Sequence, residues 1–159
     1  MGNKISSEEI YLKELSNDNN WNSLSIYYDL NEEIIDKFAN ELDWRLMSKC
    51  QKLSEQLIKK YSKKVDWILI SQFQKLSEEF IEEYSNFVDW FYICKNQKLS
   101  ESFIEKHKDK INWDIACKYQ KLSEDFIEKH KHCFIDKTIQ IAKNKEVIIC
   151  NKFQKKKFI

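Results

Sequence analysis

Proline is absent from the 159 residues of this chain, and the only glycine is Gly2. Tight turns in strand-rich folds rely on glycine, asparagine and proline, so this scarcity favours an all-α fold. No apolar run approaches the roughly 20 residues that a membrane-spanning helix needs, and no secretory signal is visible. Charge is also balanced, with 27 basic and 26 acidic residues. Net charge therefore gives no argument for binding to nucleic acid or to a membrane.

The sequence also lacks the usual signatures of catalysis and metal binding. The five cysteines include no Cys-x-x-Cys pair, which is typical of free thiols in a reducing cytosol. With no glycine beyond position 2, a phosphate-binding loop is excluded, and no Ser-His-Asp order or His-Glu-x-x-His motif occurs. We therefore expect no enzymatic activity, no cofactor and no metal site. Thiol chemistry at Cys133, beside His130 and His132, is the one enzymatic alternative.

An exact internal repeat organises the chain. The pentapeptide Gln-Lys-Leu-Ser-Glu begins at residues 51, 74, 97 and 120, so each step is 23 residues. The five tryptophans keep the same interval, at Trp21, Trp44, Trp67, Trp90 and Trp113. Fixed periodicity of this kind is the signature of a repeat architecture.

Each repeat carries two signals for the start of a short helix. In one copy, Ser54 is a good N-cap, with Leu53 before it and Ile58 in the first turn. Asp66 caps a second helix, whose predicted apolar face is Leu69, Ile70 and Phe73. Helices of about two turns are marginal alone in water, so each pair must pack against its neighbours.

The predicted fold is therefore an all-α solenoid of about six helix-turn-helix repeats. We expect residues 1–29 to form an imperfect N-terminal capping repeat and residues 30–121 to form the regular repeats. Residues 122–159 are expected to form a degenerate C-terminal repeat and a basic tail, because the motif drifts there and six lysines accompany one glutamate from residue 143. Degenerate ends are expected where a repeat has water on one side.

A repeat turns one position into a row along the stack, and the tryptophan row has two interpretations. Exposed indoles in line with lysines would stack the bases of single-stranded nucleic acid. Buried indoles would fill the space between successive helix pairs, each N–H bonded to a local carbonyl. The apolar neighbours on the same helix favour the structural core. Nucleic acid is therefore not the expected partner, although it stays as an alternative.

Two polar rows are expected to be structural. Ser25, Ser48, Ser71, Cys94 and Cys117 share one position, which indicates that small volume is what the position requires. The glutamines of the pentapeptide are expected to bond backbone groups at helix ends, and a glutamine ladder that reads a partner's backbone is the alternative.

We expect the histidines to fill an aromatic position of the repeat rather than to act as catalytic bases. His107 and His130 fall in the register of Phe38, Tyr61 and Tyr84. The run from His130 to Cys133 offers three zinc ligands, yet no fourth stands at a recognised spacing.

Exposed positions that change between copies are the candidates for partner binding. A constant scaffold with a variable face is how repeat proteins build a binding surface, although neutral drift of solvated positions would look the same. Phe87 is the best single anchor, because it is an aromatic residue in an otherwise polar link. The predicted partner-binding set consists of Lys59, Lys60, Lys63, Glu82, Glu83, Phe87, Glu105, Lys106 and Lys108.

The amino terminus matches the pattern for N-myristoylation, with Gly2 second and Ser6 sixth. One acyl chain anchors a protein only marginally, and the basic tail from Lys152 to Lys157 is a candidate second signal. A lipidated peripheral membrane adaptor in a eukaryotic cell is thus a further alternative.

The run from Gln97 to Trp113 resembles the unit of short-repeat proteins from giant DNA viruses and related AT-rich genomes. The resemblance covers roughly residues 30–131. It implies a helical repeat protein expressed in the cytoplasm of a eukaryotic host, and it brings no catalytic residues. Together with the repeat pattern, it leads us to expect a non-enzymatic protein-interaction module or scaffold, with a host protein as partner.

Overall fold

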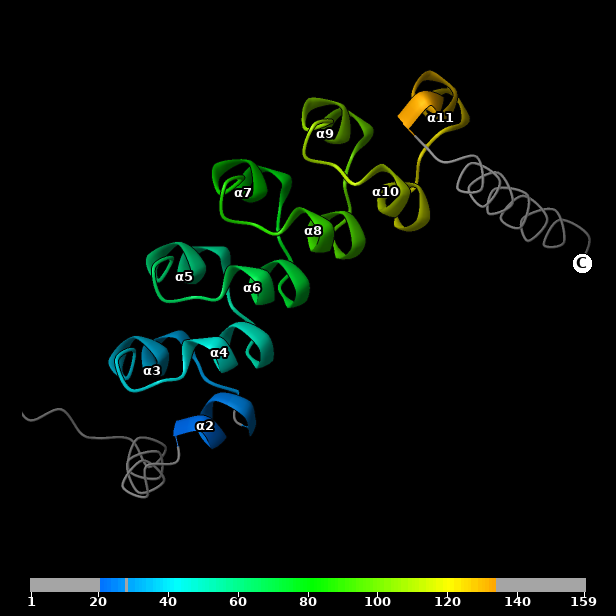
Figure 1. Cartoon of the computed structure of the whole chain (residues 1–159). Coiled ribbons are helices and arrows are strands. Elements are labelled where there is room, and N and C mark those ends of the chain that lie inside the picture. Colours follow the sequence, from blue (N-terminus) through cyan, green and yellow to red (C-terminus); the bar gives the residue numbers. More distant parts are fainter. Residues whose placement is uncertain (1–20, 28, 134–159) are drawn as a thin grey trace, which may run out of the picture. The chain divides into compact units, whose positions relative to one another are not determined.

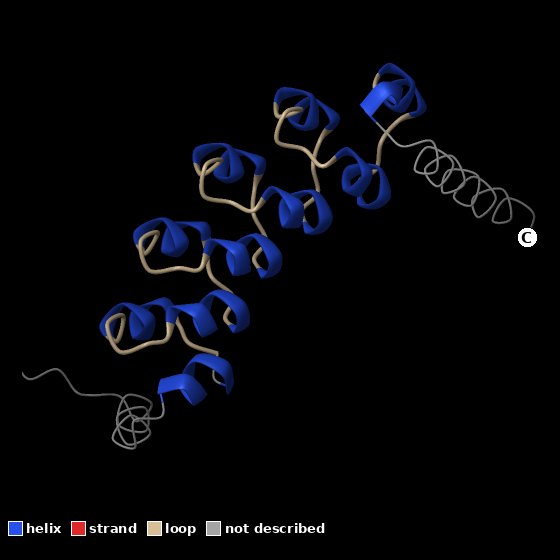
Figure 2. Cartoon of the chain, in the orientation of Figure 1, coloured by secondary structure: helices blue, strands red, loops and turns tan. Residues whose placement is uncertain are grey.

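The structure is a computed structural model that describes residues 21–27 and 29–133, and every described element is helical (Figures 1 and 2). The first helices of successive repeats are α3 (Glu32–Lys37), α5 (Glu55–Lys60), α7 (Glu78–Glu83), α9 (Glu101–Lys106) and α11 (Glu124–Lys129). The second helices are α2 (Trp21–Tyr27), α4 (Trp44–Cys50), α6 (Trp67–Phe73), α8 (Trp90–Asn96) and α10 (Trp113–Tyr119), and a 3-10 turn, η1 (Lys131–Cys133), follows α11. The predicted all-α fold of short helical repeats is confirmed for this part of the chain.

The helix boundaries follow from the capping residues. Ser54 adopts an extended backbone, and its hydroxyl accepts a hydrogen bond from the Leu57 amide, which starts α5. One carboxylate oxygen of Asp66 accepts from the amides of Ile68 and Leu69, which starts α6. Both caps satisfy amides that have no partner inside the helix. The same two devices recur in the other repeats, so the 23-residue period of the sequence becomes a period of helix pairs.

The core is built from one face of each helix. Ile58, Ile70, Ile81, Ile93 and Ile104 are fully buried. Phe73 departs from the predicted apolar face, because its side chain is 46% exposed, and Leu69 is only half-buried. A helix of two turns has room for one buried stripe, and in α6 Ile70 and Ser71 occupy it. Phe73 lies beside this stripe, four residues after the half-buried Leu69, and meets the solvent.

Contacts divide the chain into two compact units. One extends to Leu76 and includes Tyr84–Val88, and the other holds Ser77–Glu83 and continues from Asp89. In the first unit α4 packs against both α2 and α6, and in the second α8 packs against α10. Within each unit the first helices lie in one layer and the second helices in another (Figure 1). Each unit is a solenoid stack, and residues 1–20, 28 and 134–159 lie outside the described part.

Candidate interaction surfaces

The glutamine of the pentapeptide joins each repeat to the one before it. The Gln74 side-chain oxygen accepts from the Leu53 amide at 3.0 Å. Its Nε2 donates to the carbonyls of Ser48 at 2.9 Å and Gln51 at 2.8 Å. Gln120 repeats all three bonds in the second unit, to Leu99, Cys94 and Gln97. The glutamines therefore bond the chain's own backbone at helix ends, as the sequence suggested, and the partners of Gln74 lie 21 to 26 residues earlier in the chain.

The serine of the pentapeptide and the first glutamate of the preceding first helix form a second link between repeats. Besides capping its helix, Ser54 donates its hydroxyl to Glu32 at 2.5 Å. In the second unit the hydroxyl of Ser100 donates to Glu78 at 2.9 Å. Each of these glutamates is the first residue of the first helix in one repeat and accepts a hydrogen bond from the N-cap serine of the next repeat. The leucine of the pentapeptide is buried in every copy.

Lysine is the one member of the pentapeptide without a framework contact. Its four copies are exposed, and none forms a hydrogen bond or an ion pair among the described residues. They are Lys52, Lys75, Lys98 and Lys121. The lysine is nevertheless as constant as the four side chains that hold the repeats together.

The tryptophans are structural, and their rings lie against the next repeat. The Trp44 ring lies 4.4 Å from that of Tyr61 between centroids, and its Nε1 donates to the Ala39 carbonyl at 2.7 Å. Trp113 meets His130 in the second unit, at 4.9 Å. Trp44 is buried at 7% exposure, whereas the other four tryptophans are half-buried. This geometry agrees with the core interpretation and gives one face of each indole an aromatic neighbour.

The small residues also carry hydrogen bonds, which a requirement for volume alone would not explain. The hydroxyl of Ser48 donates to the Trp44 carbonyl at 2.6 Å and accepts from the Asp66 amide at 3.0 Å. Cys94 occupies the same position and is fully buried, and this burial raises the pKa of its thiol. A protonated, inaccessible thiol is a poor nucleophile.

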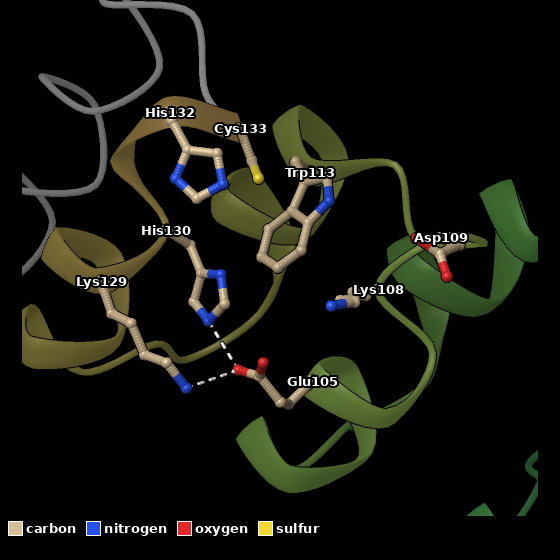
Figure 3. A pocket seen from close by; sticks show the side chains of 8 residues that line it. All are labelled: Glu105, Lys108, Asp109, Trp113, Lys129, His130, His132 and Cys133. Carbon is tan, nitrogen blue, oxygen red and sulfur yellow. Dashed lines mark hydrogen bonds and ion pairs between the residues drawn. The ribbon is translucent and has the colours of Figure 1, made fainter.

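His107 and His130 stand in the predicted aromatic position, and each also contacts a glutamate. His130 Nε2 lies 2.6 Å from Glu105 Oε2, which Lys129 Nζ approaches at 3.0 Å (Figure 3). The hydrogen bonds from Lys129 and His130 lower the pKa of the Glu105 carboxyl. Lys106 and His107 act in the same way on the pKa of Glu82.

Figure 3 shows the hollow beside this cluster, which His132, Cys133 and Asp109 also line. His130 is turned toward Glu105 and Trp113 rather than toward Cys133. Within the described residues, no three His, Cys, Asp or Glu side chains gather closely enough to hold a metal ion.

These ion pairs predict a loss of stability in acid. A carboxyl whose folded pKa is lowered stabilises the fold fully above its unfolded pKa of about 4.5 and loses that contribution as the pH falls through the folded pKa. The melting temperature should therefore fall as the pH is lowered below about 4.5. We expect the fall to be smaller in the Glu82→Gln/Glu105→Gln variant, as measured by circular dichroism.

The control for this experiment is Glu79→Gln, which removes an exposed glutamate that forms no ion pair in the described part of the chain. It should follow the wild type across the same pH range. Equal acid sensitivity in the wild type and the double variant would contradict the role of the two glutamates.

The predicted partner-binding residues do not form one set. Four of them are engaged within the stack, since Lys60 pairs with Asp36 at 2.5 Å and Lys106 with Glu82 at 3.0 Å, while Glu105 holds Lys129. The charged residues outside these pairs, all exposed, are Lys59, Lys63, Glu83 and Lys108. Phe87 is 60% exposed, and its ring lies 5.5 Å from Trp67.

Sequence reasoning missed the apolar residues on the outer side of the second helices. Ile68 is 54% exposed, and Phe91, Phe73 and Tyr119 are each more than 40% exposed. A signal was present, because the position after tryptophan changes from Arg45 to Ile68 between adjacent copies. A position that accepts both arginine and isoleucine does not belong to a core.

Comparisons of the chain with protein-family models, with curated proteins and with solved structures gave no match. None of the described helices has the length and hydropathy required to cross a membrane. The candidate lipidation site, Gly2, and the basic tail lie outside the described residues.

Proposed function

We propose that this protein is a non-enzymatic interaction module that binds a protein partner through the exposed positions of its helical repeats. The exposure of Phe87 is the observation that carries the proposal. A phenylalanine that is 60% exposed contributes little to its own fold, whereas exposed aromatic side chains are frequent anchors of protein interfaces. It stands on a link between two capped helices, next to Trp67 and Tyr84.

The repeat uses different positions for its internal contacts and for its exposed surface, and this separation supports the same proposal. Contacts between repeats use side chains that recur every 23 residues, such as Gln74, Ser54 and Ile58. The exposed link residues change from copy to copy, as from Lys63 to Asn86. A fixed framework that carries a variable surface is the usual way in which repeat proteins recognise other proteins. The resemblance of the repeat to those of giant DNA viruses extends the proposal to a partner in the cytoplasm of a host cell.

The arrangement of the tryptophans weighs against single-stranded nucleic acid as the partner. Bases stack on an open aromatic face. Trp44 lies against Tyr61, and Trp113 against His130, so one face of each is already occupied by a ring of the next repeat. At another tryptophan, Trp90, the ammonium of Lys110 lies 5.5 Å from the ring centroid and covers part of the indole.

Affinity purification of the tagged full chain from eukaryotic lysate tests the proposal. We expect a stoichiometric protein partner, identified by mass spectrometry, that the Phe87→Ser variant loses. The matched control is Lys110→Ser, which removes a side chain beside a tryptophan at the same repeat position one copy later. An eluate whose 260 nm absorbance shows nucleic acid removed by salt, with no protein partner, would overturn the proposal.

A further inference from the structure

A groove lies along the second helices of the first unit, centred on Phe73. One hollow of about 590 Å³ is lined by Leu46, Lys49 and Leu69 together with Phe73. Phe73 and Lys49 also line a second hollow of about 480 Å³, on the side of Lys52 and Lys75. We name these six residues the Phe73 groove. It has an apolar floor from α4 and α6 and lysines along its rim.

The charge of the groove is positive, and the described residues do not neutralise it. Lys49, Lys52 and Lys75 are exposed and form no hydrogen bond or ion pair in the described ranges. Two acidic residues stand close by. Asp66 binds the amides that begin α6 and lies 4.0 Å from Arg45, and Asp43 caps α4 in the same manner. Both carboxylates are therefore engaged at helix starts, and the rim keeps its positive charge.

The second unit carries the same combination on the corresponding helices. Lys98 and Lys121 are exposed and lack an internal partner among the described residues. Phe91 is 43% exposed and Tyr119 is 44% exposed. Exposed aromatic residues and exposed pentapeptide lysines thus occur in both units, each considered by itself. In the second unit, Lys95 lies over the rings of Phe91 and Tyr119.

We infer that the Phe73 groove binds an acidic peptide segment of a partner protein, with an apolar side chain of the peptide seated against Phe73 and its carboxylates on Lys49, Lys52 and Lys75. This inference rests on the proposed function and adds the location of a site and the chemistry of its ligand. It accounts for the constant lysine of the pentapeptide, which performs no task in the framework. The affinity would come from burial of the anchor, and the lysines would supply steering and selection for acidic sequences.

The apolar lining of the groove favours a peptide over nucleic acid. The hollows beside Phe73 are walled by Leu46, Leu53 and Leu69, which suit an aliphatic or aromatic side chain.

The test is selection of a phage-displayed library of random 12-residue peptides on the immobilised full chain. We expect enriched sequences in which aspartate or glutamate flanks one leucine, phenylalanine or tryptophan. A synthetic peptide of that consensus should bind more weakly to Lys52→Glu/Lys75→Glu by about tenfold or more, because two attractive charges become repulsive. It should also bind more weakly to Phe73→Ser, and its affinity should fall as salt is raised.

Lys63→Glu/Lys108→Glu is the matched control, since it makes the same change of charge at exposed link lysines that have no internal partner in the described part. Its affinity for the peptide should stay within about twofold of wild type. Circular dichroism confirms that each variant keeps its fold.

Each of the other outcomes overturns the inference. Enrichment of basic or uncharged peptides, no enrichment at all, or equal weakening by the link variant excludes the groove as an acidic-peptide site. Binding of a fluorescent oligo-dT in place of any peptide assigns the lysines to nucleic acid. A dimer in sedimentation that Lys52→Glu/Lys75→Glu dissociates assigns the groove to a second copy of the chain. The lysate experiment with Phe87→Ser decides the general proposal separately.

Discussion

Replacement of Trp44 by alanine should lower the free energy of unfolding by about 3–5 kcal/mol, the usual cost of removing a large aromatic side chain from a core. Trp44 is 7% exposed, its ring lies 4.4 Å from Tyr61 of the next repeat, and its N–H bonds to the Ala39 carbonyl. The substitution thus removes contacts within a repeat and between repeats. Urea unfolding followed by far-ultraviolet circular dichroism measures the change.

Two further variants separate the contributions at this position. Trp44→Phe keeps a ring against Tyr61 and loses the hydrogen bond, so its cost should be clearly smaller than that of Trp44→Ala. Trp21→Ala removes a half-buried indole whose described ring contact is with Phe38, and it should also cost less. Small and nearly equal losses at both tryptophans would show that the indoles are not part of the core.

The second large effect is expected at Gln74. Gln74→Ala leaves the Leu53 amide and the carbonyls of Ser48 and Gln51 without their partner inside the protein. An unsatisfied buried polar group costs about 1–3 kcal/mol, so the total should be about 3 kcal/mol or more. Gln74→Glu should also be destabilising, because a carboxylate cannot donate to the two carbonyls.

The control for Gln74 is Gln56→Ala, on the exposed side of α5. It should change the free energy of unfolding by no more than about 0.5 kcal/mol, as is usual for surface substitutions. If Gln74→Ala is as mild as Gln56→Ala, solvent replaces the lost bonds and the glutamine row does not hold the repeats together.

The helices were predicted well from the sequence because each repeat contains two N-cap residues, one for each of its helices. Ser54 and Asp66 are strong N-caps, each next to a buried apolar residue, and the helices begin immediately after them. Local chemistry of this kind needs no knowledge of the neighbouring repeat. The aromatic register of His107 was readable for the same reason, since it follows from counting along the period.

The contacts between repeats were less predictable. The backbone partners of Gln74 lie 21 to 26 residues away in sequence, and no spacing rule indicates which backbone groups a buried side chain will reach. Pairing of the charged candidates was missed for the same reason. Lys60 looked like a free surface charge until the structure placed it beside Asp36 of the preceding repeat.

The exposure of several apolar residues was also not predicted from the sequence, and Phe73 shows why. Its spacing from Ile70 is that of a neighbour on the same helical face. However, Phe73 lies on the flank of the helix with the half-buried Leu69, at its last residue, while Ile70 and Ser71 form the buried stripe. Periodicity therefore overestimates the buried stripe at the last residue of so short a helix.

Amide hydrogen exchange measured by nuclear magnetic resonance tests the central claim most directly, namely that glutamine side chains join consecutive repeats. The amides of Leu53 and Leu99 lie outside the helices and have their bonds to Gln74 and Gln120. We expect both amides to exchange as slowly as core helical amides such as that of Ile70. In the Gln74→Ala variant, the Leu53 amide should exchange faster, while the Leu99 amide should stay protected. Exchange of Leu53 in the wild type as fast as that of an exposed link amide would contradict the claim.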